Sequence, residues 1–335
     1  MSKHKWTTMQ DVALRANVGK ITVSRVIRTP EKVSVETRKR VQEAIRELGY
    51  VPDEMAGALS SSRSRIVGAL VSTLADSVFS STIDGLSQTL RREGYELLLT
   101  NTDYAPEFEE QAVRTLLGRR PDGMVLTSSQ HTPAVQALLR QSRVPVVELW
   151  ELPEDPICHV VGFSNRMAGR AITEYLVSQS HRRIAFIGGS REGDQRGQER
   201  VAGYREVMGK AGLGEGLFPD AGAAGVSDVE MGARCLAAAL KRWADLQAVV
   251  CVSDSVALGA LCEAARRGLR VPEDLAVTGF GGGDMSRAAG LNLTTIEFPG
   301  HRIGQMAADL LLDPAIGDQA QTVDLGFTLR RRGTA

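Results

Sequence analysis

The chain has 335 residues, and its 40 basic residues balance 40 acidic ones. This length exceeds that of one typical domain and suits a small domain joined to a larger body. No stretch approaches the run of about 20 apolar residues that spans a membrane. The first residues are polar and basic, without the apolar run of an export signal. The sequence therefore argues against a membrane-spanning or exported protein, and we expect a cytoplasmic one.

The basic residues are concentrated at the start of the chain. Residues 1–65 hold 13 lysines and arginines against 7 acidic residues, so the remaining chain carries the opposite excess. A basic segment attracts phosphate groups and makes binding depend on salt. This distribution favours contact between the first 65 residues and nucleic acid. The alternative is a solvated basic surface without a partner.

Neither the cysteines nor the glycine-rich stretches form a catalytic or metal-binding pattern. The four cysteines have no CxxC spacing and no histidine at the spacing of a metal ligand, so we expect them to be reduced core residues. The glycine stretches at 188–189 and 281–283 lack the spacing of a nucleotide-binding loop, and no Ser-His-Asp pattern is present. We therefore expect no metal, no cofactor and no catalytic residue.

Two short helices joined by a tight turn are predicted between residues 8 and 26. Thr8 and Asp11 are typical of a helix N-terminus, and the first helix ends at a turn around Gly19. The second helix directs four side chains outward: Lys20, Ile21, Thr22 and Arg25. Two helices in this order form a helix-turn-helix unit, whose second helix enters the DNA major groove. We expect residues 1–51 to be a DNA-binding domain.

Residues 8–62 resemble the DNA-binding domain of the lactose-repressor/galactose-repressor family of bacterial transcription regulators. The family pattern of Val-Ser, Thr-Arg and Leu-Gly-Tyr-x-Pro is present at 33–34, 37–38 and 48–52. Gly19 departs from the Ser or Thr that usually caps the second helix, and it caps more weakly. The resemblance implies a dimer on a palindromic operator. The expected DNA contacts are Thr8, Lys20, Ile21, Thr22, Ser24, Arg25, Ser34 and Leu59, with Ser24 and Ser34 on phosphates.

The linker at residues 52–64 is rich in small residues. It has too little apolar surface to form a stable helix alone, so we expect order only when a partner organises it. By resemblance it is the family's hinge helix, and Leu59 matches the leucine that enters the central minor groove. The alternative is a packing leucine. Asp53 and Glu54 depart from the family pattern and bring negative charge near phosphates.

From Arg65 onward, apolar strands alternate with amphipathic helices, which predicts parallel sheets covered on both faces by helices. The expected fold is α/β: a helix-turn-helix head and a body (65–335) with the two-lobed architecture of periplasmic sugar-binding proteins, which close on a ligand. We assign residues 65–163 and 294–329 to the first lobe and residues 164–293 to the second. The chain is expected to return to the first lobe near residues 293–296 and to complete it with a helix at 303–312 and a segment at 323–329.

Ligands of open parallel sheets bind beyond the carboxyl ends of the strands, so the residues that follow each strand are candidate contacts. In the first lobe these are Leu74, Asp76, Val78, Phe79, Thr127, Ser128 and His131. In the second lobe, Arg200 matches the arginine that the family directs at ligand oxygens, and Ser253 and Asp254 match its Asn-Asp pair. His131 would meet a ligand carboxylate or hydroxyl, or else be structural.

Gly281 is the most informative departure from the family pattern. Family members that bind neutral sugars tend to carry an aspartate there, and its loss beside Arg200 favours an anionic ligand. The alternative is a shifted loop in which Asp284 takes that role.

A narrower resemblance at residues 122–127, 146–149, 161–163 and 324–329 is to the gluconate-utilisation repressors of the family. It implies a dimeric repressor released by gluconate or a ketogluconate. A phosphorylated or neutral sugar, or a corepressor role for the ligand, stays open, and an enzyme such as a sugar-acid kinase is the alternative of another class. No apolar heptads follow Leu329, which favours a dimer over a tetramer.

Overall fold

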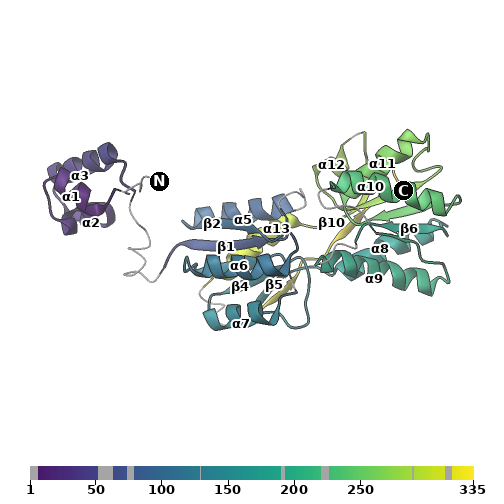
Figure 1. Ribbon diagram of the computed structural model, residues 1–335, viewed down its shortest axis with the longest axis horizontal. Helices are drawn as coiled ribbons and strands as arrows, with labels where there is room; N and C mark the ends of the chain where they lie inside the picture. Colours follow the sequence, from purple (N-terminus) through teal and green to yellow (C-terminus); the bar gives the residue numbers. More distant parts are fainter. Residues whose placement is uncertain are drawn as a thin grey trace. The chain divides into compact units, whose positions relative to one another are not determined.

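The computed structural model divides into two compact units, residues 1–64 and 65–335, each described by itself (Figure 1). The residues that it describes are 7–51, 63–73, 79–128, 130–189, 193–219, 226–288, 290–313 and 319–335. Within these ranges, no helix has the length and apolar character that a membrane crossing requires.

The first unit is a three-helix domain. Its helices are α1 (Met9–Arg15), α2 (Lys20–Arg28) and α3 (Val35–Leu48), with a 3-10 turn at Pro30–Lys32. The capping signature expected at the start of α1 is confirmed, because Asp11 N–H donates to Thr8 Oγ1 (3.3 Å) and Thr8 N–H donates to Asp11 Oδ2 (2.8 Å). Helix α2 begins after Gly19 without a side-chain cap. The buried side chains of the three helices form one small apolar core.

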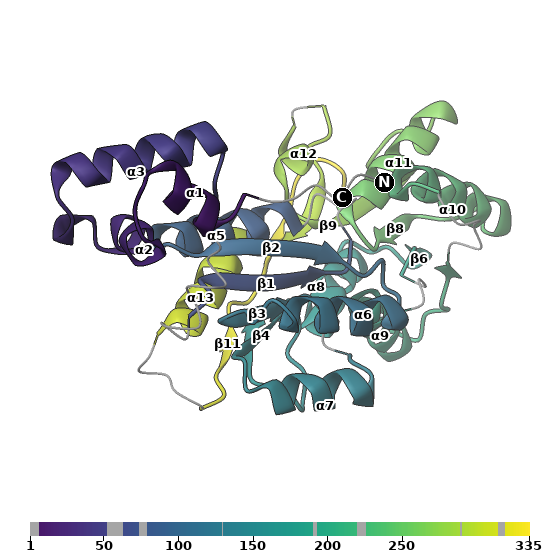
Figure 2. The same ribbon diagram turned by 60° about the vertical axis from the view of Figure 1, so that its left-hand side comes forward.

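The first lobe of the second unit is a six-stranded parallel sheet. Its strands are β1 (Ile66–Val71), β2 (Glu96–Asn101), β3 (Gly123–Leu126), β4 (Val146–Leu149), β5 (His159–Gly162) and β11 (Thr322–Asp324), in the order β11-β5-β4-β3-β1-β2. Helices α5 (Ser80–Arg92) and α13 (Gly300–Leu312) cover one face, and α6 (Pro106–Leu117) and α7 (Pro133–Ser142) cover the other (Figure 2). Alternate residues of β1 enter separate apolar clusters, which explains the continuous apolar run of that strand.

The second lobe repeats this architecture. Its sheet has the order β12-β10-β9-β8-β6-β7, and every strand pair is parallel except β10 with β12. The strands are β6 (Ile184–Ile187), β7 (Leu217–Phe218), β8 (Ala248–Cys251), β9 (Ala276–Gly281), β10 (Thr294–Glu297) and β12 (Thr328–Arg330). The helices are α8 (Asn165–Ser178), α9 (Gln195–Lys210), α10 (Asp228–Arg242), α11 (Asp254–Arg266) and α12 (Asp284–Arg287). The α/β fold predicted from the sequence is confirmed.

The lobe boundary expected near residue 294 is wrong. Strand β10 pairs with β9, as Thr294 lies opposite Thr278, so the chain returns to the first lobe only after Glu297. The single segment expected at 323–329 is two strands in different sheets: β11 pairs with β5, and β12 pairs with β10. The chain turns between them at Gly326, which has a φ of 63°. The chain therefore crosses between the lobes three times, after β5, β10 and β11.

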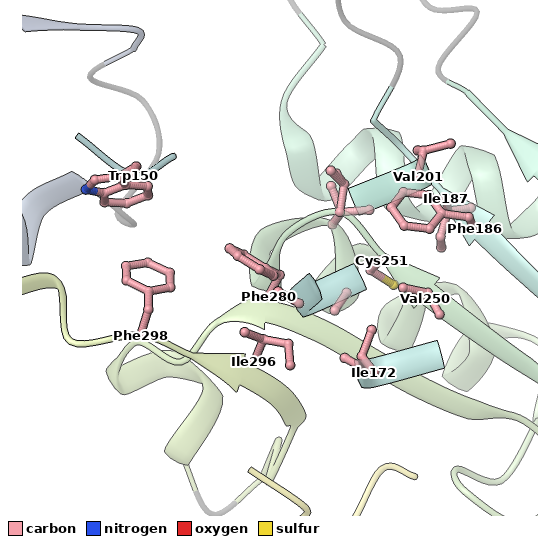
Figure 3. Packing of buried hydrophobic residues seen from close by; sticks show 14 of the residues in the cluster. Trp150, Ile172, Phe186, Ile187, Val201, Val250, Cys251, Phe280, Ile296 and Phe298 are labelled. Carbon is pink, nitrogen blue, oxygen red and sulfur yellow. The ribbon is translucent and has the colours of Figure 1, made fainter. Parts of the chain in front are cut away.

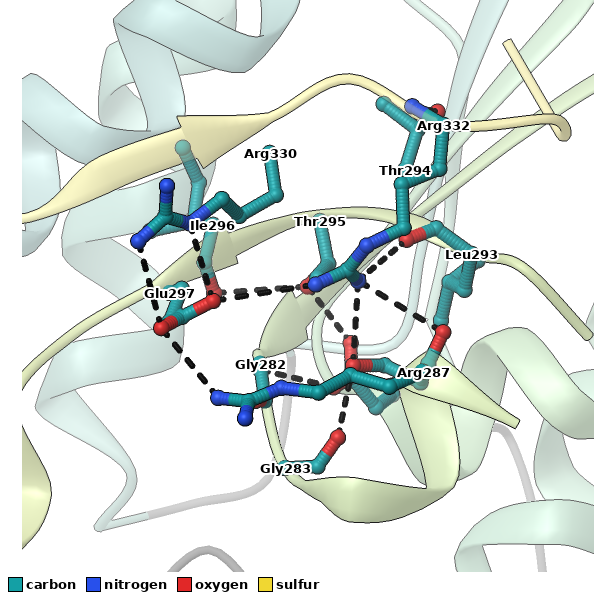
Figure 4. Close-up of polar contacts among 12 residues, drawn as sticks. Gly282, Gly283, Arg287, Leu293, Thr294, Thr295, Ile296, Glu297, Arg330 and Arg332 are labelled. Carbon is teal, nitrogen blue, oxygen red and sulfur yellow. Dashed lines mark hydrogen bonds and ion pairs between the residues drawn. The ribbon is translucent and has the colours of Figure 1, made fainter. Parts of the chain in front are cut away.

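Three arginines surround the residue that ends β10 (Figure 4). Glu297 accepts from Arg330 Nε at 3.0 Å and from Arg287 Nη2 at 3.2 Å, and its Oε2 lies 3.7 Å from Arg332 Nη2. Arg332 also donates to the carbonyl of Leu293 at 2.8 Å. These contacts join the chain entering the second crossing to the chain leaving the third, so the two crossings are held side by side.

Reciprocal glycines bring the helices of each lobe into close contact. A Cβ at Gly169 of α8 would overlap the carbonyl of Arg200 on α9, and a Cβ at Gly203 of α9 would overlap a carbonyl of α8. Gly304 plays the same part between α13 and α5, and Gly259 between α11 and α10. Helix α9, which carries Arg200, is therefore set at a distance from α8 that only glycine permits.

We expect Gly169→Ala to lower the free energy of unfolding by about 1–3 kcal/mol, because the added methyl group forces α8 and α9 apart. Urea unfolding followed by circular dichroism measures this. Gly209→Ala on α9 is the matched control: no atom lies within 4 Å of its Cβ position, so helix propensity alone should leave stability unchanged or raise it by up to about 1 kcal/mol. Equal effects of the two substitutions would contradict the packing argument.

Candidate DNA-binding and effector sites

The exposed face of α2 gathers most of the predicted major-groove contacts. Lys20, Ile21 and Arg25 are exposed, and Thr22 is partly buried above the core residue Val23. Ile21 is 70% exposed, which is unusual for an isoleucine and leaves an apolar group between two cations. This face offers charge for phosphates and an apolar contact for a base edge, such as a thymine methyl.

The remaining predicted DNA contacts differ in their local roles. Thr8 caps α1, and Ser34 caps α3, where its Oγ accepts from Thr37 N–H at 3.3 Å. Ser24 is partly buried on α2. Leu59 lies outside the described residues. Thr8 and Ser34 therefore fix helix starts, and the contact of Ser24 and Ser34 with phosphates stays a prediction.

The predicted effector contacts lie partly outside the described residues, where Leu74, Asp76 and Val78 belong. Of the others, five lie at the carboxyl ends of strands, two lie just before helices α5 and α7, and one lies on α9: these are Thr127, Ser128, Ser253, Asp254 and Gly281, then Phe79 and His131, then Arg200. They come from both lobes, and the geometry below describes how they are held.

A run of aromatic rings forms the floor between the lobes (Figure 3). Ring centroids lie 4.6 Å apart between Phe79 and Trp150, 4.7 Å between Trp150 and Phe298, and 5.0 Å between Phe298 and Phe163. Phe163, Phe298 and Phe327 each belong to one of the three crossings, and Phe327 packs edge-on against Phe163. The sequence analysis identified only Phe79 of this set. Every crossing is thus anchored by an aromatic ring in one shared cluster.

Two arginines of α9 lie over this floor. Arg196 and Arg200 are one helical turn apart and only 6% and 8% exposed. The Arg196 guanidinium lies 5.0 Å from the ring centre of Phe79, and that of Arg200 lies 3.5 Å from the ring centre of Phe280. Arg200 donates through Nε to Asn165 Oδ1 at 2.8 Å and through Nη1 to the carbonyl of Val252 at 2.7 Å. Arg200 was predicted, whereas Arg196 was missed.

Arg196 reaches from the second lobe to the first. Its Nη1 donates to the carbonyl of Thr127 at 2.7 Å and its Nη2 to Ser72 Oγ at 2.9 Å. No ion pair joins it to a carboxylate within the ranges that the structure describes. A buried cation with only neutral acceptors is costly, and a guanidinium pairs best with a planar anion. This position is suited to a ligand carboxylate.

Ser253 and Asp254 are occupied by the protein's own backbone and side chains. Ser253 Oγ caps α11 by accepting from Val256 N–H at 3.2 Å. Asp254 accepts from Gly282 N–H at 2.8 Å and from Thr295 Oγ1 at 2.6 Å. Asp254 therefore holds the loop after β9 in place.

The backbone conformation at Gly281 explains why this position has no side chain, and the missing side chain also removes a negative charge. Its φ is 144°, a conformation that residues with a Cβ rarely adopt. Asp284 is exposed at the start of α12, whereas Gly281 is partly buried at the end of β9. An aspartate at 281 would need a different loop, so the loss of negative charge is built into this backbone.

His131 is enclosed by two carboxylates in the first lobe. Its Nδ1 lies 2.7 Å from Glu109 Oε1 and its Nε2 lies 3.4 Å from Glu148 Oε1, and the imidazole is only 1% exposed. Burial alone would lower the pKa of His131, but hydrogen bonds and charge attraction from the two glutamates outweigh it and raise the pKa to about 9. These contacts favour the structural role that the sequence left open, because the ring already faces carboxylates on both sides.

A cavity of about 230 Å³ lies at the ends of β1, β2 and β3. Its lining includes Ser72, Thr102, Ser128 and His131 of the first lobe and Gly193 of the second. Gly193 approaches so closely that a Cβ there would overlap a carbonyl of the first lobe. The candidate residues Ser128 and His131 thus share one cavity, next to the serine that accepts from Arg196.

The histidine cluster predicts a pH dependence of stability. The folded-state pKa of His131, about 9, lies above the ordinary value of 6.5. The stabilisation is therefore complete below pH 6.5 and is lost as the pH rises to 9. We expect urea unfolding to give wild type an advantage over His131→Gln on the order of 2–3 kcal/mol at pH 6, which shrinks as the pH rises above 6.5 and is lost above pH 9. A difference that is constant from pH 6 to 10 would contradict a protonated His131.

Family models match both units of the chain. Residues 8–53 match the model for bacterial regulatory proteins of the lacI family, and residues 64–329 match the model for periplasmic binding proteins and the sugar-binding domain of the LacI family. Together the two models cover the three-helix unit and both lobes.

Curated relatives match over nearly the full length. The transcriptional regulator GntR of Escherichia coli K12 is 34% identical, with 99% of each chain covered. The regulator IdnR of the same strain is 31% identical over 100% of both chains. The repressor CytR of this strain is 34% identical, with 96% of this chain and 95% of the relative covered.

Solved structures agree with the sequence relatives. A LacI-family regulator from Silicibacter pomeroyi has a TM-score of 0.88 and 30% identity, covering 98% of this chain and 99% of its own. The lac repressor dimer bound to operator has a TM-score of 0.77 and 26% identity, covering 98% and 99%. The matched relatives are transcription regulators, not enzymes. From both units and at full length, the chain belongs to the LacI family of bacterial regulatory proteins.

Proposed function

We propose that this protein is a homodimeric repressor that binds a palindromic operator through its first unit and releases it when its second unit binds a sugar acid such as gluconate or a ketogluconate. The observation that carries the choice of ligand is the buried guanidinium of Arg196, which has neutral acceptors on one side and a second arginine one turn away. The similarity to GntR and IdnR agrees with the resemblance to gluconate-utilisation repressors in the sequence, and the repressor CytR matches at a similar identity.

Charge at the cleft supports an anionic ligand. Arg196 and Arg200 place two guanidinium groups over an aromatic floor, and Gly281 has a φ of 144°, which an aspartate rarely adopts. A carboxylate accepts two parallel hydrogen bonds from one guanidinium, whereas a neutral hydroxyl does not. The hydroxyl groups of a sugar acid would meet polar groups such as Ser72 and Ser128, which line the adjoining cavity.

The edge of the first-lobe sheet supports dimerisation. Strand β2 is the last strand in the sheet order and leaves Leu98 and Leu99 38% and 39% exposed. Exposed leucines on an edge strand are unfavourable in a monomer and suit an interface between two copies. Closure of the lobes on the ligand would then shift the first lobes against each other, separate the linkers at 52–64 and lower operator affinity by the coupling free energy.

The ligand class is tested by isothermal titration calorimetry with D-gluconate, 2-ketogluconate, 6-phosphogluconate and a neutral hexose. We expect saturable micromolar binding of a sugar acid, weakened about 10- to 100-fold by Arg196→Met, since a charge-assisted hydrogen bond contributes about 1.5–3 kcal/mol. Arg205→Met is the matched control, because Arg205 lies on the same helix, is exposed and pairs with Glu215. Binding of the neutral or phosphorylated compound alone would refute the sugar-acid assignment.

The DNA interface is tested with an operator selected from a random palindromic library. We expect Arg25→Ala to weaken operator binding at least 10-fold, because loss of a base contact costs about 1–3 kcal/mol. Fluorescence anisotropy measures this. Arg46→Ala on α3, where Arg46 donates to the carbonyl of Gln42, is the control.

Gluconate should release the operator. Tighter operator binding with gluconate would show a corepressor instead, and an unaffected Arg25→Ala would exclude this face of α2.

A further inference from the structure

Arg196 of the second lobe donates two hydrogen bonds to strand ends of the first lobe. It belongs to the first turn of α9 in the second lobe, and both of its acceptors, Ser72 Oγ and the carbonyl of Thr127, belong to the first lobe. Ser72 directly follows β1, and Thr127 directly follows β3, the adjacent strand. These bonds form only when the lobes are close together.

The two acceptors are a fixed unit of the first lobe. The N–H of Ser72 donates to Thr127 Oγ1 at 2.9 Å, and the two side-chain oxygens lie 3.2 Å apart. Ser72 and Thr127 are both buried. The site that Arg196 meets is therefore set by the sheet, and it does not need a ligand to form.

Within the described ranges, two hydrogen bonds from Arg196 to the first lobe leave further N–H groups of the guanidinium available. An arginine carries five N–H groups, and the bonds to Ser72 and Thr127 use one from each terminal nitrogen. The rings of Phe79 and Trp150, with centres at 5.0 and 5.6 Å, restrict the guanidinium further. The remaining N–H groups suffice for a bidentate carboxylate, so a ligand need not displace the contacts with the first lobe.

We propose that Arg196 is an interlobe latch: docked on Ser72 and Thr127, it presents its remaining N–H groups to the carboxylate of the effector, so that anion recognition and lobe closure are one event. Ser72 is then a positioning residue for effector specificity, because it acts by holding Arg196. The ligand part of this inference rests on the proposed sugar-acid function, whereas the closure of the ligand-free lobes does not.

The ligand-free closure is tested by spin labels on the full chain, one on each lobe, at Glu107→Cys and Gln198→Cys, which are exposed positions. Cys158→Ser and Cys262→Ser remove the more accessible native thiols. We expect the interlobe distance distribution to lengthen in Ser72→Ala and further in Arg196→Met. Ser178→Ala, whose hydroxyl bonds only within its own helix turn, is the control. Distributions identical to wild type in both variants would overturn the latch.

Specificity is tested by comparing D-gluconate with D-glucitol, the neutral alcohol of the same chain length. We expect Ser72→Ala to weaken gluconate binding about 10-fold with little effect on glucitol, because the misplaced guanidinium loses mainly its carboxylate bonds. Ser72→Thr keeps the acceptor oxygen and should restore discrimination in favour of the acid. A protein with only a packing role at Ser72 would lose affinity for both compounds equally, which would contradict the proposal.

The two proposals can fail separately. If wild type binds gluconate, Arg196→Met does not, and Ser72→Ala binds it as tightly as wild type or more tightly, the latch is refuted and the sugar-acid function stands. If no sugar acid binds to wild type while Arg196→Met still opens the ligand-free lobes, the sugar-acid function is refuted and the closure by Arg196 stands.

Discussion

A positive charge buried between two lobes, with neutral acceptors in place of a carboxylate, is the constraint on which the site depends. The guanidinium of Arg196 is removed from water by the aromatic floor and held by one hydroxyl and one carbonyl of the opposite lobe. Such an arrangement is expensive unless an anion completes it. Opening of the lobes would expose the guanidinium to water, whereas closure would keep its positive charge in a low-dielectric site facing the ligand. The charge therefore couples the position of the lobes to the chemistry of the ligand.

The three crossings between the lobes meet in one cluster of aromatic rings. Each contributes a phenylalanine to one cluster, and ring stacking tolerates small rotations that a hydrogen-bond ladder does not. Glu297 adds electrostatic restraint, because it ends β10 just before the second crossing and contacts Arg330 and Arg332, which follow the third crossing. Phe280 belongs to the same aromatic group and lies beneath Arg200, so the crossings and Arg200 share contacts.

Features set by residues close in the sequence were predicted correctly, whereas features set by partners far away in the sequence were not. The cap at Thr8 and the outward face of α2 follow from short spacings, and the structure has both. Arg196 was missed because its acceptors, Ser72 and Thr127, lie far away in the sequence and in the other lobe. Strands β10 and β12 were assigned to the wrong lobe because pairing partners leave no periodic signal in either strand. The crossing phenylalanines share no spacing, since only the fold brings them together.

The position of Ser72 explains how closure at the cleft would reach the rest of the chain. Ser72 follows β1 directly, and β1 begins at Ile66, two residues after the first unit ends. A strand paired on both sides, with β2 and β3, moves as part of its sheet and does not bend on its own. A displacement that Arg196 imposes on Ser72 would therefore be carried along β1 to residue 65, which directly follows the linker at 52–64. Ser72 and the end of the linker lie at opposite ends of one strand, so the proposed coupling needs no further moving element between them.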